Sequence, residues 1–139
     1  MQAIDIENLS HQYGERLALD GVDLQIKAGE IFGLLGPNGG GKTTLFRILS
    51  TLLTPTRGTV RVLGVDPVRD GASVRSRIGV VFQSPSLDPK LTVLENMRHH
   101  GHLYGLKGAL LQARMEDALK RVGLFDRRED PAEVLSGGL

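Results

Sequence analysis

Eight consecutive residues in the first third of the chain form its most constraining sequence feature. They read Gly-Pro-Asn-Gly-Gly-Gly-Lys-Thr over residues 36–43 and match the pattern G-x-x-x-x-G-K-[ST]. Glycine leaves backbone amides exposed, so such a loop surrounds phosphate groups with donors, and a following helix start adds partial positive charge. The pattern predicts a nucleotide-phosphate site in which Lys42 reaches the β- and γ-phosphates and the Thr43 hydroxyl binds Mg²⁺. The residues predicted to line this site are Gly36, Pro37, Asn38, Gly39, Gly40, Gly41, Lys42, Thr43 and Thr44.

The segments beside this loop have the patterns of a strand and a helix. Residues 31–35 are densely apolar and predict a strand buried on both faces, as central parallel strands are. Residues 43–53 carry one apolar stripe at helical spacing and predict an amphipathic helix. Apolar and polar residues alternate over 4–9 and 22–26, which predicts two half-buried strands, and residues 59–63 predict another.

The sequence changes character after a third apolar run, over residues 78–82. Thr92 and Glu95 have the spacing of a capping box, which predicts that a helix begins there. A second helix is predicted over residues 108–122, with Gly123 at the position of a C-terminal cap glycine. The chain is therefore expected to be strand-rich in its first part and helical in its last third.

Composition restricts the class of protein further. A length of 139 residues suffices for one domain, and 40% hydrophobic with 24% charged residues is ordinary for a globular protein. A formal net charge of +1 gives no electrostatic case for nucleic-acid binding, so we expect no nucleic-acid partner. The sequence has no cysteine, which excludes disulfide frameworks, thiolate zinc sites and cysteine nucleophiles.

The phosphate loop by itself leaves several enzyme classes open. A GTPase would need a guanine-reading motif of the Asn-Lys-x-Asp type, which this sequence lacks, whereas small-molecule kinases remain compatible with the loop. A second glycine cluster, Leu-Ser-Gly-Gly over residues 135–138, narrows the choice. With Gln83 between the two clusters, the three motifs in this order resemble the ATP-binding cassette (ABC) family over nearly the whole chain.

This resemblance implies an α/β fold: a P-loop NTPase core with an N-terminal antiparallel β subdomain and a helical subdomain. The antiparallel β and P-loop core would occupy residues 1–83, and the helical subdomain up to the signature would occupy residues 84–139. The family continues with further core strands, one ending in Asp-Glu, and with a switch histidine, so we expect the fold to be incomplete at the C-terminus. The segments at 31–35 and 78–82 would then lack the core strands that the family places beside them. Because the carboxylate expected to activate water belongs to the Asp-Glu strand, we also expect that this chain alone does not hydrolyse ATP.

The resemblance also implies roles for residues outside the phosphate loop. Tyr13 matches the aromatic residue that stacks on adenine, and Gln83 matches the glutamine that contacts Mg²⁺ or the attacking water. Ser136, Gly137 and Gly138 match the signature, which closes over the γ-phosphate of ATP held by a partner cassette. The family usually has glutamine at the next position, where this sequence has leucine.

Taken with the loop, these matches imply a function. Lys42 and Gln83 would be catalytic, and Thr43 and Gln83 would contact Mg²⁺. The parent protein would be the ATP-binding subunit of an ABC transporter, coupling ATP binding and hydrolysis to substrate movement across a membrane, of export type. Its partners would be transmembrane permease subunits and a second cassette in a head-to-tail dimer, at the cytoplasmic face of the cell membrane. The alternatives are a soluble ABC ATPase of DNA repair or translation, and a nucleotide-binding fragment without catalysis.

Overall fold

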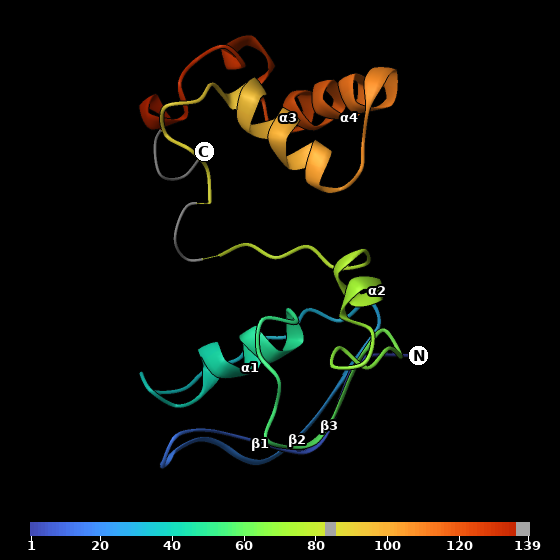
Figure 1. The fold of residues 1–139 in the computed structure, drawn as a ribbon, viewed down its shortest axis with the longest axis vertical. Helices are drawn as coiled ribbons and strands as arrows, with labels where there is room; N and C mark the ends of the chain where they lie inside the picture. The colour runs from blue at the N-terminus through green and yellow to red at the C-terminus, as the bar shows by residue number, and fades with distance from the viewer. Residues whose placement is uncertain (83–85, 136–139) are drawn as a thin grey trace. The chain divides into compact units, whose positions relative to one another are not determined.

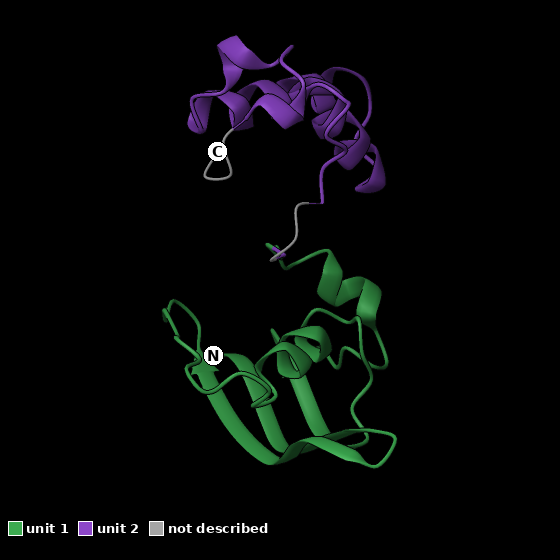
Figure 2. Cartoon of the chain, turned by 90° about the vertical axis from the view of Figure 1, so that its left-hand side faces the viewer, with its two compact units in different colours: residues 1–81 green, residues 82–139 purple. Residues whose placement is uncertain are grey.

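A computed structural model describes residues 1–82 and 86–135 of the chain (Figure 1). The chain divides into two units, residues 1–81 and residues 82–139, which Figure 2 draws in green and purple. Four residues expected at the site, Gln83, Ser136, Gly137 and Gly138, lie outside the described residues. None of the described helices is long and apolar enough to cross a membrane.

Unit 1 is built on a three-stranded antiparallel sheet. Strand β1 (Gln2–Tyr13) pairs with β2 (Arg16–Lys27) on one side and with β3 (Arg57–Val62) on the other, giving the order β2-β1-β3. A two-residue turn joins β1 to β2, so the last residue of β1 and the first of β2 are cross-strand partners. The predicted antiparallel β subdomain is confirmed, with strands longer than the alternation indicated.

Helix α1 (Lys42–Leu49) packs on this sheet and forms the core of unit 1 with it (Figure 1). The short helix α2 (Gly71–Arg75) adds one buried valine. Burying each large aliphatic side chain stabilises a fold by about 1.5–3 kcal/mol. The buried hydrophobic core consists of Ile6, Leu9, Leu19, Leu45, Ile48, Val60, Val62 and Val74.

Helix α1 ends earlier than the predicted residue 53. Thr51 adopts a left-handed conformation, with φ of 66°. The Thr51 amide then donates to the Ile48 carbonyl at 3.0 Å and the Leu52 amide donates to the Arg47 carbonyl at 2.8 Å. These two bonds satisfy the last carbonyls of the helix in the pattern of a Schellman motif, so the helix stops at Leu49.

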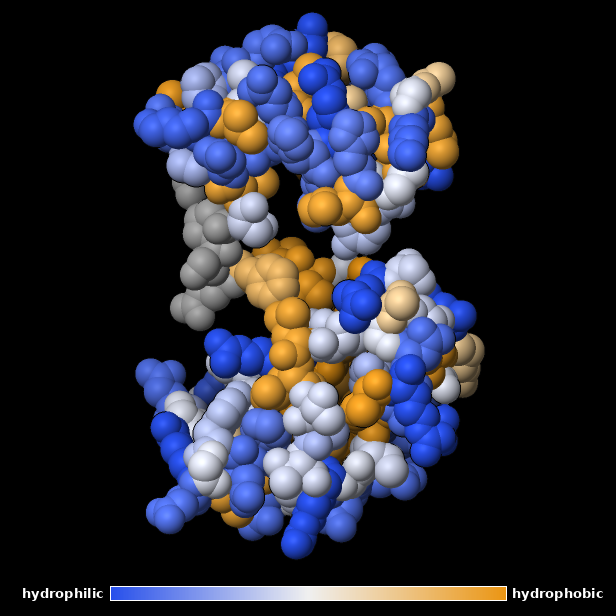
Figure 3. Space-filling view, viewed as in Figure 1, coloured by the Kyte–Doolittle hydropathy of each residue, from blue (hydrophilic) through white to orange (hydrophobic). Residues whose placement is uncertain are grey.

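The predicted strand over residues 31–35 is wrong: this segment forms no strand, and neither do residues 78–82. Ile31, Leu35 and Val81 are 101%, 94% and 100% exposed. A strand exists only through hydrogen bonds to a neighbouring strand, and within the described part of the chain neither segment has one. Apolar side chains consequently gather on the surface of unit 1, where Figure 3 shows them in orange.

Unit 2 is helical, as predicted. Helices α3 (Val93–Leu103) and α4 (Gly108–Arg121) pack on each other, and the short 3₁₀ turns η1 (Phe125–Arg127) and η2 (Ala132–Val134) follow. Leu111, Met115 and Leu119 are buried along one stripe of α4. The helical period of the sequence therefore predicted the face of α4 that packs inside the unit.

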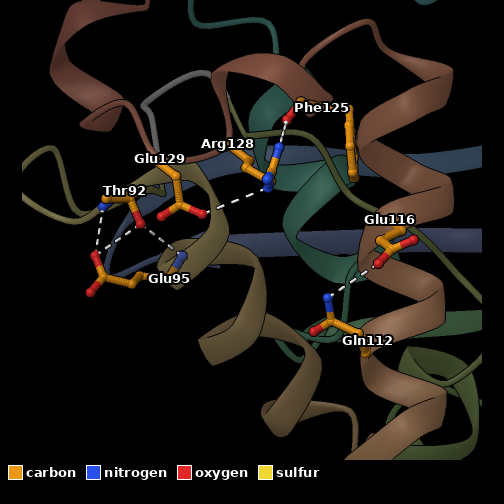
Figure 4. A network of polar contacts seen from close by, with 7 residues as sticks. All are labelled: Thr92, Glu95, Gln112, Glu116, Phe125, Arg128 and Glu129. Carbon is orange, nitrogen blue, oxygen red and sulfur yellow. Dashed lines mark hydrogen bonds and ion pairs between the residues drawn. The ribbon is translucent and has the colours of Figure 1, made fainter.

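The capping box at the start of α3 is confirmed (Figure 4). The Glu95 amide donates to the Thr92 hydroxyl at 3.1 Å, and the Thr92 amide donates to the Glu95 carboxylate at 2.8 Å. The bond from the Thr92 amide, with a further bond from its hydroxyl, holds the pKa of Glu95 below its usual value. The reciprocal bonds satisfy two amides that a helix start otherwise leaves without partners.

The end of α4 also follows its sequence signal. Gly123 has φ of 70°, a conformation that glycine adopts at little cost. Its amide donates to the Lys120 carbonyl at 3.2 Å, and the Leu124 amide donates to the Leu119 carbonyl at 2.9 Å. The chain then turns toward η1, where the Arg128 guanidinium lies 4.5 Å from the centre of the Phe125 ring (Figure 4).

Candidate nucleotide-binding site

The phosphate loop leads directly into α1, and Gly41 is the residue that caps the helix. Gly41 has φ of 81°, and a Cβ atom at this position would lie 2.7 Å from Leu19 Cδ2 and would overlap the Ala18 carbonyl oxygen. The loop therefore packs directly against β2, with no room for a side chain at its last position. This close approach fixes the loop on the sheet.

The start of α1 offers hydrogen-bond donors and positive potential to an anion. The first-turn amides of a helix have no partners within the helix, and no acidic residue occupies the first turn of α1. The Lys42 ammonium donates to the Gly36 carbonyl at 2.6 Å and to the Pro37 carbonyl at 2.7 Å. These bonds hold the Lys42 charge across the loop, beside the helix start.

A cleft of about 250 Å³ opens over the loop and the start of α1. Residues 38–44 line it, together with Tyr13, Arg16 and Ala18 of the β1–β2 hairpin and Arg47 of α1. Three of the lining residues carry positive charge, and none of them is an aspartate or a glutamate. A cleft with this charge beside a helix start is suited to the phosphate groups of a polyanionic ligand.

Tyr13 lies at the edge of this cleft, at the end of β1, and is 43% exposed. Its ring packs edge-on against the buried His11 ring, with 4.7 Å between the ring centres. Hydrogen bonding to Thr44, with a smaller contribution from Arg47, holds the pKa of Tyr13 below its usual value. The Tyr13 ring thus packs on a neighbouring residue of β1 and lies at the cleft over the phosphate loop.

With this geometry in place, comparison with known proteins identifies the family. A sequence model described as "ABC transporter" matches residues 19–139. The chain belongs to the ABC transporter family. The matched residues include the loop, α1 and all of unit 2, and they cover the loop and helix side of the cleft; Tyr13, Arg16 and Ala18 precede the matched segment.

Individual ABC proteins resemble the chain over almost its full length. It is 42% identical over 137 residues to a daunorubicin resistance ATP-binding protein of Streptomyces coeruleorubidus, and 38% identical over 136 residues to a Nod factor export ATP-binding protein of Ralstonia nicotianae. These matches cover 99% and 98% of the chain but 43% and 42% of the relatives. Thus the chain spans less than half the length of these curated relatives.

A solved structure gives the same family. CbiO1 of Clostridium perfringens, described as part of the ABC transporter complex CbiONQ, matches with a TM-score of 0.85 and 29% sequence identity. The match covers 99% of this chain and 57% of CbiO1. The ABC fold class implied by the sequence motifs is therefore confirmed, whereas the apolar segments at residues 31–35 and 78–82 form no strand within the described residues.

The structure brings together most of the predicted site residues. Tyr13 and the loop from Asn38 onward line one cleft, while Gly36 and Pro37 contribute the carbonyls that hold Lys42. Sequence reasoning missed the two arginines of the cleft, Arg16 and Arg47. The signals that could have found them were the short turn after Tyr13 and the spacing of one helical turn between Thr44 and Arg47.

Proposed function

We propose that the cleft binds ATP, with the triphosphate on the loop and the adenine against Tyr13. The observation that carries this proposal is the cleft itself, which is lined by the glycine-rich loop, the start of α1 and Lys42. The aromatic ring at its edge supports adenine as the base-side contact. Loop residues 36–44 would bind the phosphates through their backbone and through Lys42.

Mg²⁺ fits the same site. This ion usually keeps several water ligands and takes one or two protein groups besides the substrate phosphates. The exposed Thr43 side chain in the first turn of α1 supplies one such oxygen beside the loop. Bound there, Mg²⁺ would neutralise phosphate charge, and Gln83 would be its second protein contact as the family resemblance implies.

We further propose that the whole subunit hydrolyses ATP to drive transport, with Lys42 and Gln83 in the catalytic site. In a head-to-tail pair of cassettes, Ser136, Gly137 and Gly138 of one chain would close over the γ-phosphate bound by the other. The relatives named for daunorubicin resistance and for Nod factor export favour export as the direction. The subunit would work at the cytoplasmic face of the membrane, bound to permease subunits.

A groove in unit 2 supports the permease as a partner. It has a volume of about 540 Å³, lies along α3 and α4 and includes Met97, Leu103 and Leu106 in an otherwise mixed lining. Leu103 is 84% exposed, so apolar surface is available for contact. We propose this groove as the surface that receives a cytoplasmic segment of a permease subunit.

Nucleotide titration of the Lys42→Ala variant tests the ATP site. Lys42 serves the cleft and not the buried core, so we expect the variant to fold and to lose ATP binding in calorimetry. Lys27→Ala removes an exposed lysine outside the cleft and should bind ATP as the wild type does. Unchanged ATP affinity in a Lys42→Ala variant with a native circular dichroism spectrum would refute the proposed site.

The position of adenine is tested separately at Tyr13. Stacking of a base on an aromatic face contributes about 1–3 kcal/mol in nucleic-acid systems, so Tyr13→Ala should weaken ATP binding by roughly five- to 150-fold. Tyr13→Trp should retain most of the affinity because a flat aromatic face is kept. Inorganic triphosphate has no base, so its affinity should not change; an equal loss for both ligands would show that Tyr13 does not contact adenine.

A further inference from the structure

The β1–β2 hairpin places an arginine beside the aromatic residue of the cleft. Its two-residue turn makes Tyr13 and Arg16 direct cross-strand partners. Side chains of directly opposed residues in an antiparallel pair project from the same face of the sheet. Both residues accordingly line the cleft over the phosphate loop. The hairpin therefore positions an aromatic ring and a cation next to each other at this cleft.

The Arg16 guanidinium lies against the phosphate loop itself. Its Nη2 atom is 3.5 Å from the position that a Cβ atom on Gly39 would occupy. Gly39 has φ of 82° and carries no side chain, so the loop backbone is exposed at this point. The positive charge of Arg16 is consequently within a few ångströms of the amides that would bind phosphate oxygens.

The three cations of the cleft have different surroundings. The Lys42 ammonium is bonded to two loop carbonyls, and Arg47 lies beside the Tyr13 hydroxyl. Arg16, by contrast, is exposed, and its side chain forms no hydrogen bond or ion pair with the residues that the structure describes. Its five guanidinium donors thus face the cleft without a protein acceptor.

We propose that Arg16 is a further phosphate-contact residue, whose guanidinium pairs with the polyphosphate of ATP held at the loop. The inference rests on the proposed ATP site and adds a contact from the strand side of the cleft, opposite the helix side that carries Lys42. A planar guanidinium can donate two parallel hydrogen bonds to phosphate oxygens, which a backbone amide cannot. Arg16 thereby binds the triphosphate from the hairpin side of the cleft, while the loop binds it from the opposite side.

The test compares ATP and inorganic triphosphate as ligands of matched variants. Arg16→Gln removes the charge, and Arg61→Gln removes an exposed arginine of β3 that lies outside the cleft. Loss of a hydrogen bond to a charged group should weaken both ligands by about tenfold in Arg16→Gln. Arg61→Gln should bind both ligands as the wild type does, and Arg16→Lys should retain part of the affinity because the charge remains.

The outcomes separate this inference from the ATP site on which it rests. Failure of the wild type to bind ATP, or unchanged binding by Lys42→Ala, would overturn both proposals. If Lys42→Ala loses binding but folded Arg16→Gln keeps wild-type affinity for both ligands, only the role of Arg16 is wrong. A loss confined to ATP, with inorganic triphosphate unaffected, would also overturn it, because Arg16 would then act on the nucleoside. Adenosine, which has no phosphate, should bind equally to the wild type and to Arg16→Gln.

Discussion

The contact between the phosphate loop and β2 makes a quantitative prediction about Gly41. Alanine at this position should destabilise unit 1 more than alanine at Gly29, although the two glycines share nearly the same backbone conformation. Their φ angles are 81° and 83°. A Cβ atom at Gly41 would press on Leu19 and on the Ala18 carbonyl, whereas a Cβ atom at Gly29 would have no atom within 4 Å.

The expected magnitudes follow from these two environments. A left-handed conformation costs an alanine about 1–2 kcal/mol, and this cost applies to both positions. The lower entropy of the unfolded chain with alanine also acts equally on both, so it cancels in the comparison. Overpacking against Leu19 and the β2 backbone adds about 1–3 kcal/mol at Gly41 alone. The free energy of unfolding should therefore be lower in Gly41→Ala than in Gly29→Ala by about 1–3 kcal/mol.

The measurement needs a signal from unit 1 alone. The chain has two tyrosines and no tryptophan, so Tyr104→Phe leaves Tyr13 as the single tyrosine of the background chain. Urea unfolding followed by tyrosine fluorescence then reports unit 1, and the midpoint and slope give its free energy of unfolding. Equal midpoints for Gly41→Ala and Gly29→Ala would show that the loop does not pack on β2 as described.

Three further predictions concern the caps and the titrating groups. Thr92→Ala should lower the stability of unit 2 by about 1 kcal/mol in urea unfolding, while Thr92→Ser should retain it, because the cap hydroxyl is kept. The lowered pKa of Glu95 implies stability that is present above pH 4.5 and lost as pH falls through the folded-state pKa, and Glu95→Gln should remove this dependence. For Tyr13, phenolate absorbance should appear below the usual pKa of 10.0, and Thr44→Val should raise its pKa. These contacts favour the phenolate form of Tyr13 over the neutral phenol. Their contribution to the free energy of unfolding is therefore present above the folded-state pKa of Tyr13 and absent at pH 7, where the phenol is neutral.

The features that the sequence predicted well depend on short stretches of chain. The phosphate loop, the capping box at Thr92 and the cap glycine at position 123 each draw their partners from within a few residues. Their hydrogen bonds are therefore already implied by residue type and spacing. The amphipathic stripe of α4 is predicted for the same reason, since its period depends on the helix alone.

The features that the sequence predicted poorly depend on partners elsewhere. Residues 31–35 have the composition of a buried strand, but composition does not supply the neighbouring strand whose hydrogen bonds would make it one. The early end of α1 depends on a left-handed conformation at Thr51, a residue type that gives no signal for it. The Thr51 hydroxyl accepts a hydrogen bond from Arg75 at 2.9 Å, a contact that spans 24 positions of sequence.

The positive charge of the cleft comes from residues of two elements, β2 and α1, so no single sequence motif predicts it. The loop pattern predicted Lys42, but Arg16 reaches the loop only because the hairpin turn has two residues and sets the register of β2 against β1. This pairing sets Tyr13 and Arg16 directly opposite each other, so both side chains project from the same face of the sheet. Arg47 reaches Tyr13 only because α1 packs over the same sheet. Three cations and one aromatic ring thus meet through tertiary packing, and the proposed binding of ATP should respond to changes in the hairpin as well as to changes in the loop.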